Sequence, residues 1–176
     1  YMNIKIAKTL SFFKKYEYKI FKILNDTKFD NQLNIVDFKK NLIISFDDFK
    51  KIGIYDFSYF NINFIKALLD KKCIAFIIFH KDKLVHLRWI SVSENTHKFV
   101  DDISFHKYEK NELFGVWGNA FTNPNYRGLG LNKISISECI KFLREKNFKF
   151  SFASVRSNNQ NNIKTYIKIK KCYIYH

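Results

Sequence analysis

Apolar residues recur at helical spacing in two segments of the N-terminal half of the chain. In residues 10–24 and again in residues 61–71, apolar residues three or four positions apart alternate with lysines and other polar residues. This spacing predicts an amphipathic helix in each segment. Between them, residues 41–46 (NLIISF) form a short apolar run that predicts a strand.

Longer apolar runs follow in the middle of the chain. Residues 73–79 and 84–92 are separated by four polar residues, which predicts a β-hairpin. A polar connection occupies residues 93–111, and residues 113–121 (LFGVWGNAF) predict a third strand. Two glycines interrupt this strand, and glycines inside a strand often mark a bulge or a place where a ligand approaches the backbone.

The C-terminal third returns to a helical period and then to a strand period. Residues 131–146 carry an apolar stripe of helical spacing, residues 148–155 alternate large apolar residues with smaller or polar ones, and residues 159–168 predict a last helix. The order of elements predicts an α+β fold with one βαβ unit in its C-terminal half. No linker or composition break divides the chain, so we expect one domain over residues 2–176.

Composition narrows the class of protein. An apolar fraction of 47% and an aromatic fraction of 18% in 176 residues exclude a disordered chain. No apolar run approaches the roughly 20 residues that cross a bilayer, and no signal peptide is evident, so we expect no membrane span. Cys73, Cys139 and Cys172 lack metal-ligand or redox spacing, which favours three reduced thiols, no metal and a cytoplasmic protein.

The chain is strongly basic, with 31 Lys and Arg against 16 Asp and Glu and a net charge of +15. A basic surface attracts polyanions, including nucleic acid, anionic membranes and coenzyme A. The lysines are spread along most of the chain, and the abundance of Lys, Asn, Ile, Phe and Tyr is typical of an AT-rich genome. A basic nucleic-acid-binding module is therefore the alternative and not the preferred interpretation.

The candidate ligand-binding residues are concentrated in residues 122–130, between the third predicted strand and the helix that follows it. Gly128 and Gly130, two of only five glycines, stand directly before the helix. Glycines let successive N–H groups converge, and a helix N-terminus adds donors and partial positive charge, so the segment predicts a phosphate site with Arg127 as a cationic partner. The sequence has neither the P-loop spacing nor the G-x-G-x-x-G of dinucleotide folds.

The segment resembles the coenzyme A loop of the GNAT superfamily of N-acetyltransferases. Arg127, Gly128 and Gly130 match that pattern, Pro124 matches its lead-in, and Asn132 stands where a second small residue is usual. Downstream, the family has an Asn, a small residue and a Tyr at a spacing that is matched by Asn159, Asn162 and Tyr166. Lys170 and Lys171 replace the usual Gly-Phe, and we expect the C-terminal strand to be truncated.

The resemblance implies a mixed, mostly antiparallel sheet of six or seven strands, splayed at its centre between residues 113–121 and 148–155 and flanked by about four helices. Acetyl-CoA, as co-substrate, would lie in the opening. The residues that would bind it are Phe121, Thr122, Asn123, Arg127, Gly128, Leu129, Gly130, Leu131, Asn132 and Asn159. No metal is implied.

The reaction implied is direct attack of an amine on the thioester. It needs a proton acceptor for the amine, a donor to the oxyanion and a proton for the departing sulfur. Tyr166 matches the residue that supplies the family's usual acid for the sulfur. His86 is the candidate base, because an unperturbed histidine titrates near neutrality, with a solvated strand histidine as the alternative. Asp101, Asp102 and His106 lie in a loop that would cover the acceptor.

The preferred function is transfer of an acetyl group to the primary amine of a small molecule. Residues 84–89 and 121–124 are similar to acetyltransferases of bacterial surface-polysaccharide pathways, which suggests a nucleotide-linked amino sugar. Arg88 would then meet its phosphate, or be solvated. A peptide-directed transferase and a catalytically silent CoA-binding sensor stay open as alternative functions. A homodimer stays open as the oligomeric state.

Overall fold

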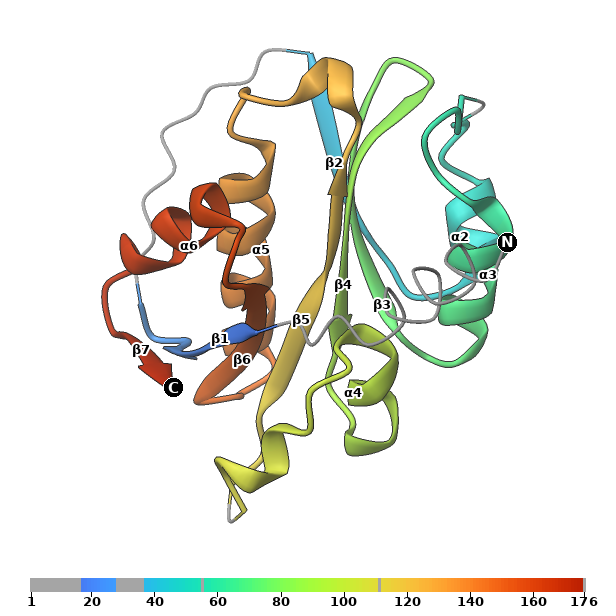
Figure 1. The fold of residues 1–176 in the computed structure, drawn as a ribbon. Helices are drawn as coiled ribbons and strands as arrows, with labels where there is room; N and C mark the ends of the chain where they lie inside the picture. The colour runs from blue at the N-terminus through green and yellow to red at the C-terminus, as the bar shows by residue number, and fades with distance from the viewer. Residues whose placement is uncertain (1–16, 28–36, 55, 111, 176) are drawn as a thin grey trace, which may run out of the picture.

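A computed structural model describes residues 17–27, 37–54, 56–110 and 112–175. Its centre is a seven-stranded sheet in the order β2-β3-β4-β5-β6-β1-β7, in which only the β5–β6 pair is parallel (Figure 1). The strands are β1 (Tyr18–Leu24), β2 (Phe38–Ile43), β3 (Ile74–His80), β4 (Lys83–Ser91), β5 (Gly115–Thr122), β6 (Phe150–Arg156) and β7 (Cys172–Tyr175). The predicted mixed, mostly antiparallel sheet is confirmed.

Helices cover both faces of the sheet. They are α2 (Phe46–Lys50), α3 (Ile62–Asp70), α4 (Glu94–Val100), α5 (Leu131–Glu145) and α6 (Gln160–Ile167), with short 3-10 helices at Phe105–Lys107 and Pro124–Tyr126. Figure 1 shows α5 and α6 on one side of the sheet and α2 and α3 on the other. None of the helices in the described residues is long and apolar enough to span a bilayer.

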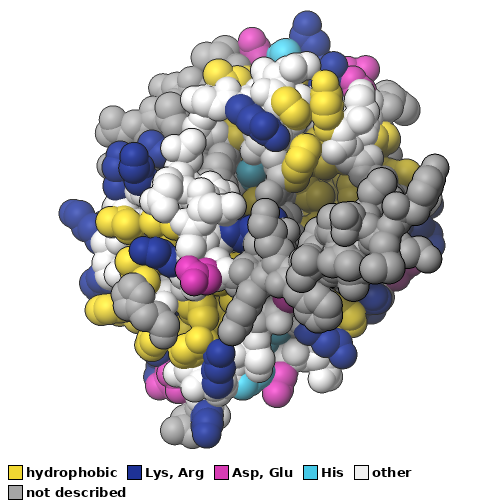
Figure 2. All heavy atoms as spheres, viewed as in Figure 1, with side chains coloured by type: hydrophobic (Ala, Val, Ile, Leu, Met, Phe, Trp, Pro, Cys, Tyr) yellow, Lys and Arg dark blue, Asp and Glu magenta, His cyan; other side chains and the backbone are white. Residues whose placement is uncertain are grey.

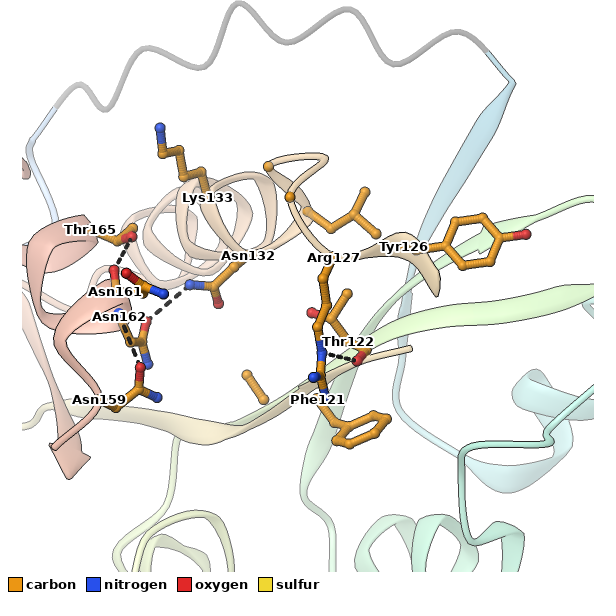
Figure 3. A pocket seen from close by; sticks show the side chains of 14 residues that line it. Phe121, Thr122, Tyr126, Arg127, Asn132, Lys133, Asn159, Asn161, Asn162 and Thr165 are labelled. Atoms are coloured by element: carbon orange, nitrogen blue, oxygen red, sulfur yellow. Dashed lines mark hydrogen bonds between the residues drawn. The ribbon is translucent and has the colours of Figure 1, made fainter. Parts of the chain in front are cut away.

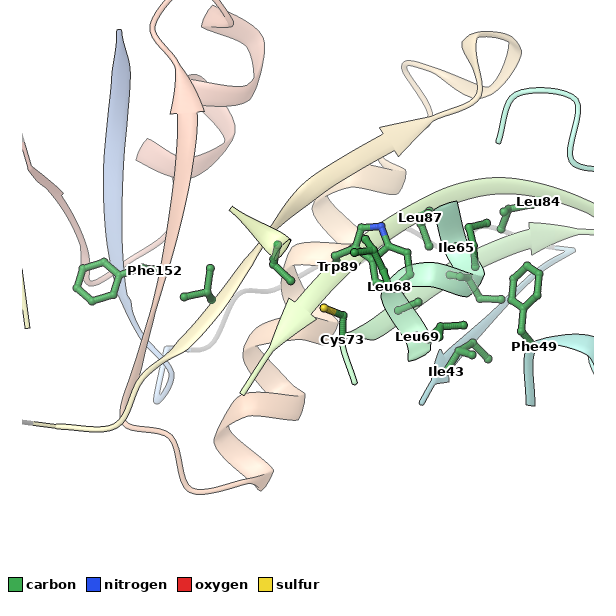
Figure 4. Close-up of a cluster of buried hydrophobic side chains, with 14 of the residues drawn as sticks. Ile43, Phe49, Ile65, Leu68, Leu69, Cys73, Leu84, Leu87, Trp89 and Phe152 are labelled. Atoms are coloured by element: carbon green, nitrogen blue, oxygen red, sulfur yellow. The ribbon is translucent and has the colours of Figure 1, made fainter. Parts of the chain in front are cut away.

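Two apolar cores correspond to these two layers. The first packs α2 and α3 against the sheet, and its buried side chains include Phe49, Leu68 and Trp89, which converge in Figure 4. The second packs α5 and α6 against the sheet and includes Trp117 and Tyr166. Both tryptophans are core residues, since Trp89 is 1% and Trp117 0% exposed.

The centre of the sheet opens between β5 and β6. These parallel strands pair only at Gly115–Ser151 and Val116–Phe152, so their carboxyl-terminal halves are not joined by ladder hydrogen bonds. A register shift in the β4–β5 pair and a positive φ of 41° at Asn119 mark a bulge in β5 at this point. The predicted splay is therefore present.

Gly118 lets the end of α4 approach β5 closely. A Cβ atom at Gly118 would lie 2.8 Å from the carbonyl oxygen of Val100. The α4 end therefore packs directly against the strand beside the opening, which explains a glycine inside an otherwise bulky strand.

The helix predicted over residues 10–24 is wrong in its described part, because Tyr18–Leu24 is strand β1; residues 10–16 lie outside the described residues. β1 lies between β6 and β7 in the sheet, and Ile20, Phe21 and Ile23 are buried on its two faces. A segment with apolar residues on both faces does not show a strand period, so spacing alone misassigns it.

Other boundaries differ for local reasons. The strand predicted at residues 41–46 lies at Phe38–Ile43, because Ser45 caps α2 by accepting a hydrogen bond from the Asp48 amide. The polar connection over residues 93–111 contains α4, whose seven residues are too few to show a clear apolar stripe. After Lys171, β7 pairs with β1, at the place where the resemblance implies a further strand.

Candidate functional site

The loop between β5 and α5 has the conformation that its glycines allow. Gly128 has a φ of 81° and Gly130, the N-cap of α5, a φ of 75°, both in the left-handed region. The Asn123 side chain accepts a hydrogen bond from the Asn125 amide and starts the short 3-10 turn. The chain therefore turns from the strand into α5 with its backbone exposed at the glycines.

Five successive backbone amides in this loop have no acceptor in the part of the chain that the structure describes. Among the described residues, no hydrogen bond is formed by the N–H groups from Gly128 to Asn132, whereas the Lys133 and Ile134 amides bond to the Gly130 carbonyl. A Cβ at Gly128 would meet nothing within 4 Å, so the loop is open on that side. Free amides at the N-terminus of a 15-residue helix are suited to an anion such as a diphosphate.

Four of these five residues, Gly128, Gly130, Leu131 and Asn132, line a cavity of about 660 Å³ (Figure 3). Its walls are the end of β5, the loop, the first turn of α5 and the start of α6. It is lined by Ala120, Phe121, Thr122, Tyr126, Arg127, Gly128, Gly130, Leu131, Asn132, Lys133, Asn159, Asn161, Asn162 and Thr165. Arg127 and Lys133 give the cavity positive charge, and Arg127 Nε donates to the Thr122 carbonyl at 3.4 Å.

The cavity brings together all the predicted cofactor-binding residues except two. Asn123 is 2% exposed, and its amide donates to the Val85 carbonyl at 2.9 Å. Leu129 is 46% exposed but does not line the cavity.

Two amide side chains in the lining of this cavity are hydrogen-bonded to each other. Asn132 Nδ2 donates to Asn162 Oδ1 at 3.0 Å, and Asn159 caps α6 by accepting from the Asn162 amide. The two departures from the small residues expected at positions 132 and 162 are therefore bonded partners (Figure 3). Sequence spacing did not indicate this pairing.

Arg88 lies beneath Asn132 and is 1% exposed. Its Nε donates to Ser135 Oγ at 2.9 Å, Nη2 to Asn132 Oδ1 at 2.5 Å and Nη1 to the Tyr166 hydroxyl at 3.5 Å. The guanidinium also lies 5.1 Å from the centre of the Trp117 ring. The expectation of a solvated arginine is wrong, because the side chain is enclosed by α5, α6 and β5.

Tyr166, the predicted acid, is 1% exposed and stacks on Trp117 with ring centroids 5.4 Å apart. Burial raises the pKa of its phenol, and the Arg88 cation opposes part of that rise. The phenol is therefore protonated at neutral pH.

His86, the predicted base, is fully buried, so the alternative of a solvated strand histidine is wrong. Its Nδ1 lies 2.8 Å from Thr122 Oγ1, and Nε2 has no partner in the described part of the chain. Burial first and the Arg88 charge second lower the pKa of His86 to about 3. The ring is neutral at pH 7.

A second cavity of about 330 Å³ is lined by residues of β5 and β6 and by the C-cap of α4. It is lined by Tyr18, Asp101, Asp102, Asn119, Ser154, Val155, Arg156, Asn159 and Asn162. Asn159 and Asn162 line both cavities, so the two spaces are separated by the start of α6.

Asp101 is the most enclosed carboxylate of this second cavity, at 8% exposed. Its Oδ2 accepts from the Ser154 amide at 3.1 Å and the Ser154 hydroxyl at 2.6 Å, and Oδ1 accepts from the Ile103 amide at 3.1 Å. Burial raises the pKa of Asp101 and outweighs these hydrogen bonds. Sequence reasoning placed Asp101 in a covering loop and missed its contact with β6, because the two residues are 53 positions apart.

The described residues hold no cluster of metal ligands and no cysteine with a lowered thiol pKa. They contain no group of three or more His, Cys, Asp or Glu that could hold a metal ion. Cys73, Cys139 and Cys172 are unpaired, and burial raises the pKa of the Cys139 and Cys172 thiols to about 12. Such thiols are weak nucleophiles at neutral pH.

Comparison with known proteins identifies the fold and the family. Solved structures similar to the chain include a GNAT acetyltransferase from Colwellia psychrerythraea (14% identity, TM-score 0.57, 91% of this chain and 53% of that one). Another is an aminoglycoside acetyltransferase from an uncultured soil metagenomic sample (16% identity, TM-score 0.53, 76% of this chain and 88% of that one). A third is a glucosamine N-acetyltransferase region of a fungal multi-domain GH3 β-N-acetylglucosaminidase (12% identity, TM-score 0.56, 97% of this chain and 22% of that one).

The chain spans about half the length of the Colwellia protein and of a Drosophila protein that is 10% identical with a TM-score of 0.53. No curated protein sequence matches the chain. Residues 34–169, more than half of the chain, match the family model described as the acetyltransferase (GNAT) family. The open glycine loop before α5, the splayed sheet and this match agree, and the chain belongs to the GNAT family of acetyltransferases.

Proposed function

We propose that the chain binds acetyl-CoA in the larger cavity and transfers its acetyl group to the primary amine of a small polar molecule. The observation that carries the proposal is the row of five amides from Gly128 to Asn132, which have no acceptor in the described part of the chain and of which four belong to residues lining that cavity. These amides and Arg127 would hold the pyrophosphate, and the end of β5 at Phe121 and Thr122 would hold the pantetheine.

Acetyl-CoA supplies an activated thioester, and the chain's own residues position it and move protons. Tyr166 gives a proton to the departing sulfur, because its phenol is protonated at neutral pH. The buried cysteines support direct attack by the amine, since a thiol with a pKa of about 12 does not form a covalent intermediate readily.

We assign the proton-accepting role to Asp101 and a positioning role to His86. Asp101 borders the cavity next to the opening of the sheet, and its raised pKa makes it a stronger base than an exposed aspartate. His86 has a pKa of about 3 and contacts Thr122, so it holds the end of β5 and does not collect a proton at neutral pH.

The smaller cavity favours a polar acceptor. Asp101 and Asp102 would attract an ammonium group, and Arg156, Asn119 and Tyr18 offer partners to hydroxyl or anionic groups. Two structural relatives are named for amino-sugar acceptors, an aminoglycoside and glucosamine, which supports an amino sugar here. The nucleotide-linked amino sugar of a polysaccharide pathway, a cytoplasmic location and a homodimer stay predictions.

The nucleic-acid alternative receives less support. On the face shown in Figure 2, lysine and arginine side chains lie at separate places and do not form one continuous patch. A module that binds nucleic acid through its backbone needs such clustering.

The test is thiol release from acetyl-CoA in the presence of single amines. The panel contains glucosamine, a UDP-linked amino sugar, an amino acid, a polyamine and a short peptide. We expect release with an amino sugar and none with the peptide. Acetyl-CoA binding without release for any amine would favour the silent CoA-binding sensor, and release only with the peptide would favour the peptide-directed transferase.

A further inference from the structure

We propose that Arg88 is a positioning residue that supplies a fixed positive charge for the departing sulfur and keeps the phenolic O–H of Tyr166 available to it. The proposal deepens the proposed function and rests on it. It concerns a residue whose sequence context suggested a phosphate contact or a solvated side chain, neither of which agrees with its buried position.

The Arg88 cation is buried without a counter-ion. It is 1% exposed, and among the described residues no carboxylate lies within salt-bridge distance of it. Its hydrogen-bond partners are neutral: Ser135, Asn132 and the Tyr166 hydroxyl. Burying an uncompensated charge is costly, so a fold that keeps one in place is suited to meet a negative charge that arrives with a ligand or develops in a reaction.

The direction of the hydrogen bond fixes what Tyr166 can do. A guanidinium only donates, so the Tyr166 oxygen accepts from Nη1 at 3.5 Å. Within the described residues, no acceptor takes the hydrogen of the phenol. An O–H whose oxygen already accepts from a cation is a better proton donor, because the cation stabilises the phenolate left behind.

The asparagine pair explains how Arg88 is held and how it connects to the cavity. Asn132 accepts from Arg88 through Oδ1 and donates to Asn162 through Nδ2, and both asparagines line the larger cavity. Small residues at positions 132 and 162 would leave the guanidinium without its Asn132 partner. The two departures from the family pattern therefore fit a chain that holds an arginine behind its cofactor cavity.

The titratable groups around the Tyr166 phenol come from β4, α5 and the end of α4. Arg88 on β4 and Cys139 on α5 act on the Tyr166 phenol, and Asp101 at the end of α4 acts on it with opposite sign to Arg88. His86 is also affected by Arg88 and is neutral at pH 7. Arg88 is thus the one permanent cation among these groups.

The amine nitrogen forms a bond to the acetyl carbon, and the carbon–sulfur bond breaks with its electron pair on sulfur. Tyr166 gives its phenolic proton to the sulfur, and Arg88 stabilises the phenolate. Asp101 takes the proton that the amine loses and releases it to solvent, from which the phenolate is protonated again.

The test uses free CoA, acetyl-CoA and the full chain, and it needs no acceptor. The Kd of free CoA and the Kd of acetyl-CoA for the full chain are measured by calorimetry between pH 7 and pH 9. A free thiol ionises near pH 8.5; if the Arg88 charge lowers the pKa of the bound thiol to about 7.5, the Kd of CoA relative to acetyl-CoA falls about sixfold over this range. Acetyl-CoA has no thiol and corrects for every effect that the two ligands share.

Arg88→Met should remove the pH-dependent change in the Kd of CoA relative to that of acetyl-CoA, while acetyl-CoA still binds. Arg88→Lys, which keeps the charge, should retain part of this change. Lys66→Met, which removes an exposed cation from α3 on the other side of the sheet, should retain it fully. A wild-type ratio that does not change with pH, or a change that survives in Arg88→Met, would overturn the inference. If Arg88→Met does not fold, the Arg88→Lys and wild-type titrations still decide it. Failure of both ligands to bind the wild type would instead remove the proposed function.

Discussion

Replacing Asp101 with Asn is the perturbation that separates its structural and catalytic roles most clearly. The carboxylate accepts three hydrogen bonds, from the Ser154 amide, the Ser154 hydroxyl and the Ile103 amide, and is 8% exposed. The asparagine side chain has only one acceptor oxygen, so at least one of these three donors would face the NH₂ group of that side chain. An unsatisfied buried donor costs about 1–3 kcal/mol, and relief of the buried charge offsets part of this, which leaves a loss of about 1–2 kcal/mol. The melting temperature should fall by about 2–8 °C.

The pH dependence of this loss has a definite sign. Because the pKa of Asp101 is raised in the folded state, the stability it contributes is fully present below the unfolded value of 3.8 and is lost as pH rises through the folded value. The deficit of Asp101→Asn relative to wild type should therefore be larger at pH 4 than at pH 7. Urea unfolding at both values measures it.

Activity completes this test. As proton acceptor, Asp101 should contribute at least about 100-fold to kcat/KM, measured with the most active amine of the panel. The matched control is Asp102→Asn, an exposed carboxylate on the same cavity, which should change stability by less than about 0.5 kcal/mol. Normal turnover in a folded Asp101→Asn protein would refute the catalytic assignment, and an unchanged melting temperature would refute the hydrogen-bond geometry.

Three further predictions concern the frame of the site. Gly118→Ala should lose about 1–3 kcal/mol by urea unfolding, because its Cβ would lie 2.8 Å from the Val100 carbonyl oxygen; a loss under about 0.5 kcal/mol would contradict this contact. Burial lowers the pKa of His86 to about 3 and of His97 to about 4, so the stability they give is present above pH 6.5 and is lost as pH falls toward 4, by up to about 1.4 kcal/mol per pH unit for each proton; stability that is flat between pH 6.5 and 4.5 would be inconsistent. Tyr166→Phe should keep its stacking on the neighbouring indole and bind acetyl-CoA normally while kcat falls at least tenfold, and an unchanged kcat would remove it from the mechanism.

Elements whose signal is local could be predicted from the sequence. The hairpin of β3 and β4 follows from two apolar runs around a polar tetrapeptide, and α5 follows from its apolar stripe. The loop before α5 was recognisable because two glycines stand together in a chain that has only five. Its left-handed φ values are the conformation that this pattern predicts.

Contacts between distant segments could not be predicted in this way. Arg88 meets Ser135 and Tyr166 across 47 and 78 positions, and Asp101 meets Ser154 across 53. Nothing in the spacing of a strand distinguishes an arginine that points into the core from a solvated one, since burial depends on which helix covers that face. The sheet order placed β1 between β6 and β7, and this tertiary pairing overrode the helical spacing of its segment.

The most direct test of the central claim is thermal unfolding with and without acetyl-CoA. At about 100 times Kd, binding to the folded state adds about 2.7 kcal/mol, which should raise the melting temperature of the wild type by about 5–11 °C. Gly130→Asp should abolish the rise, because its carboxylate would occupy the row of free amides. Gly53→Asp is the matched control, since Gly53 has a similar φ of 73° but does not line the cavity, and it should keep the rise. No rise for the wild type at millimolar acetyl-CoA, or an equal rise for Gly130→Asp, would contradict the account.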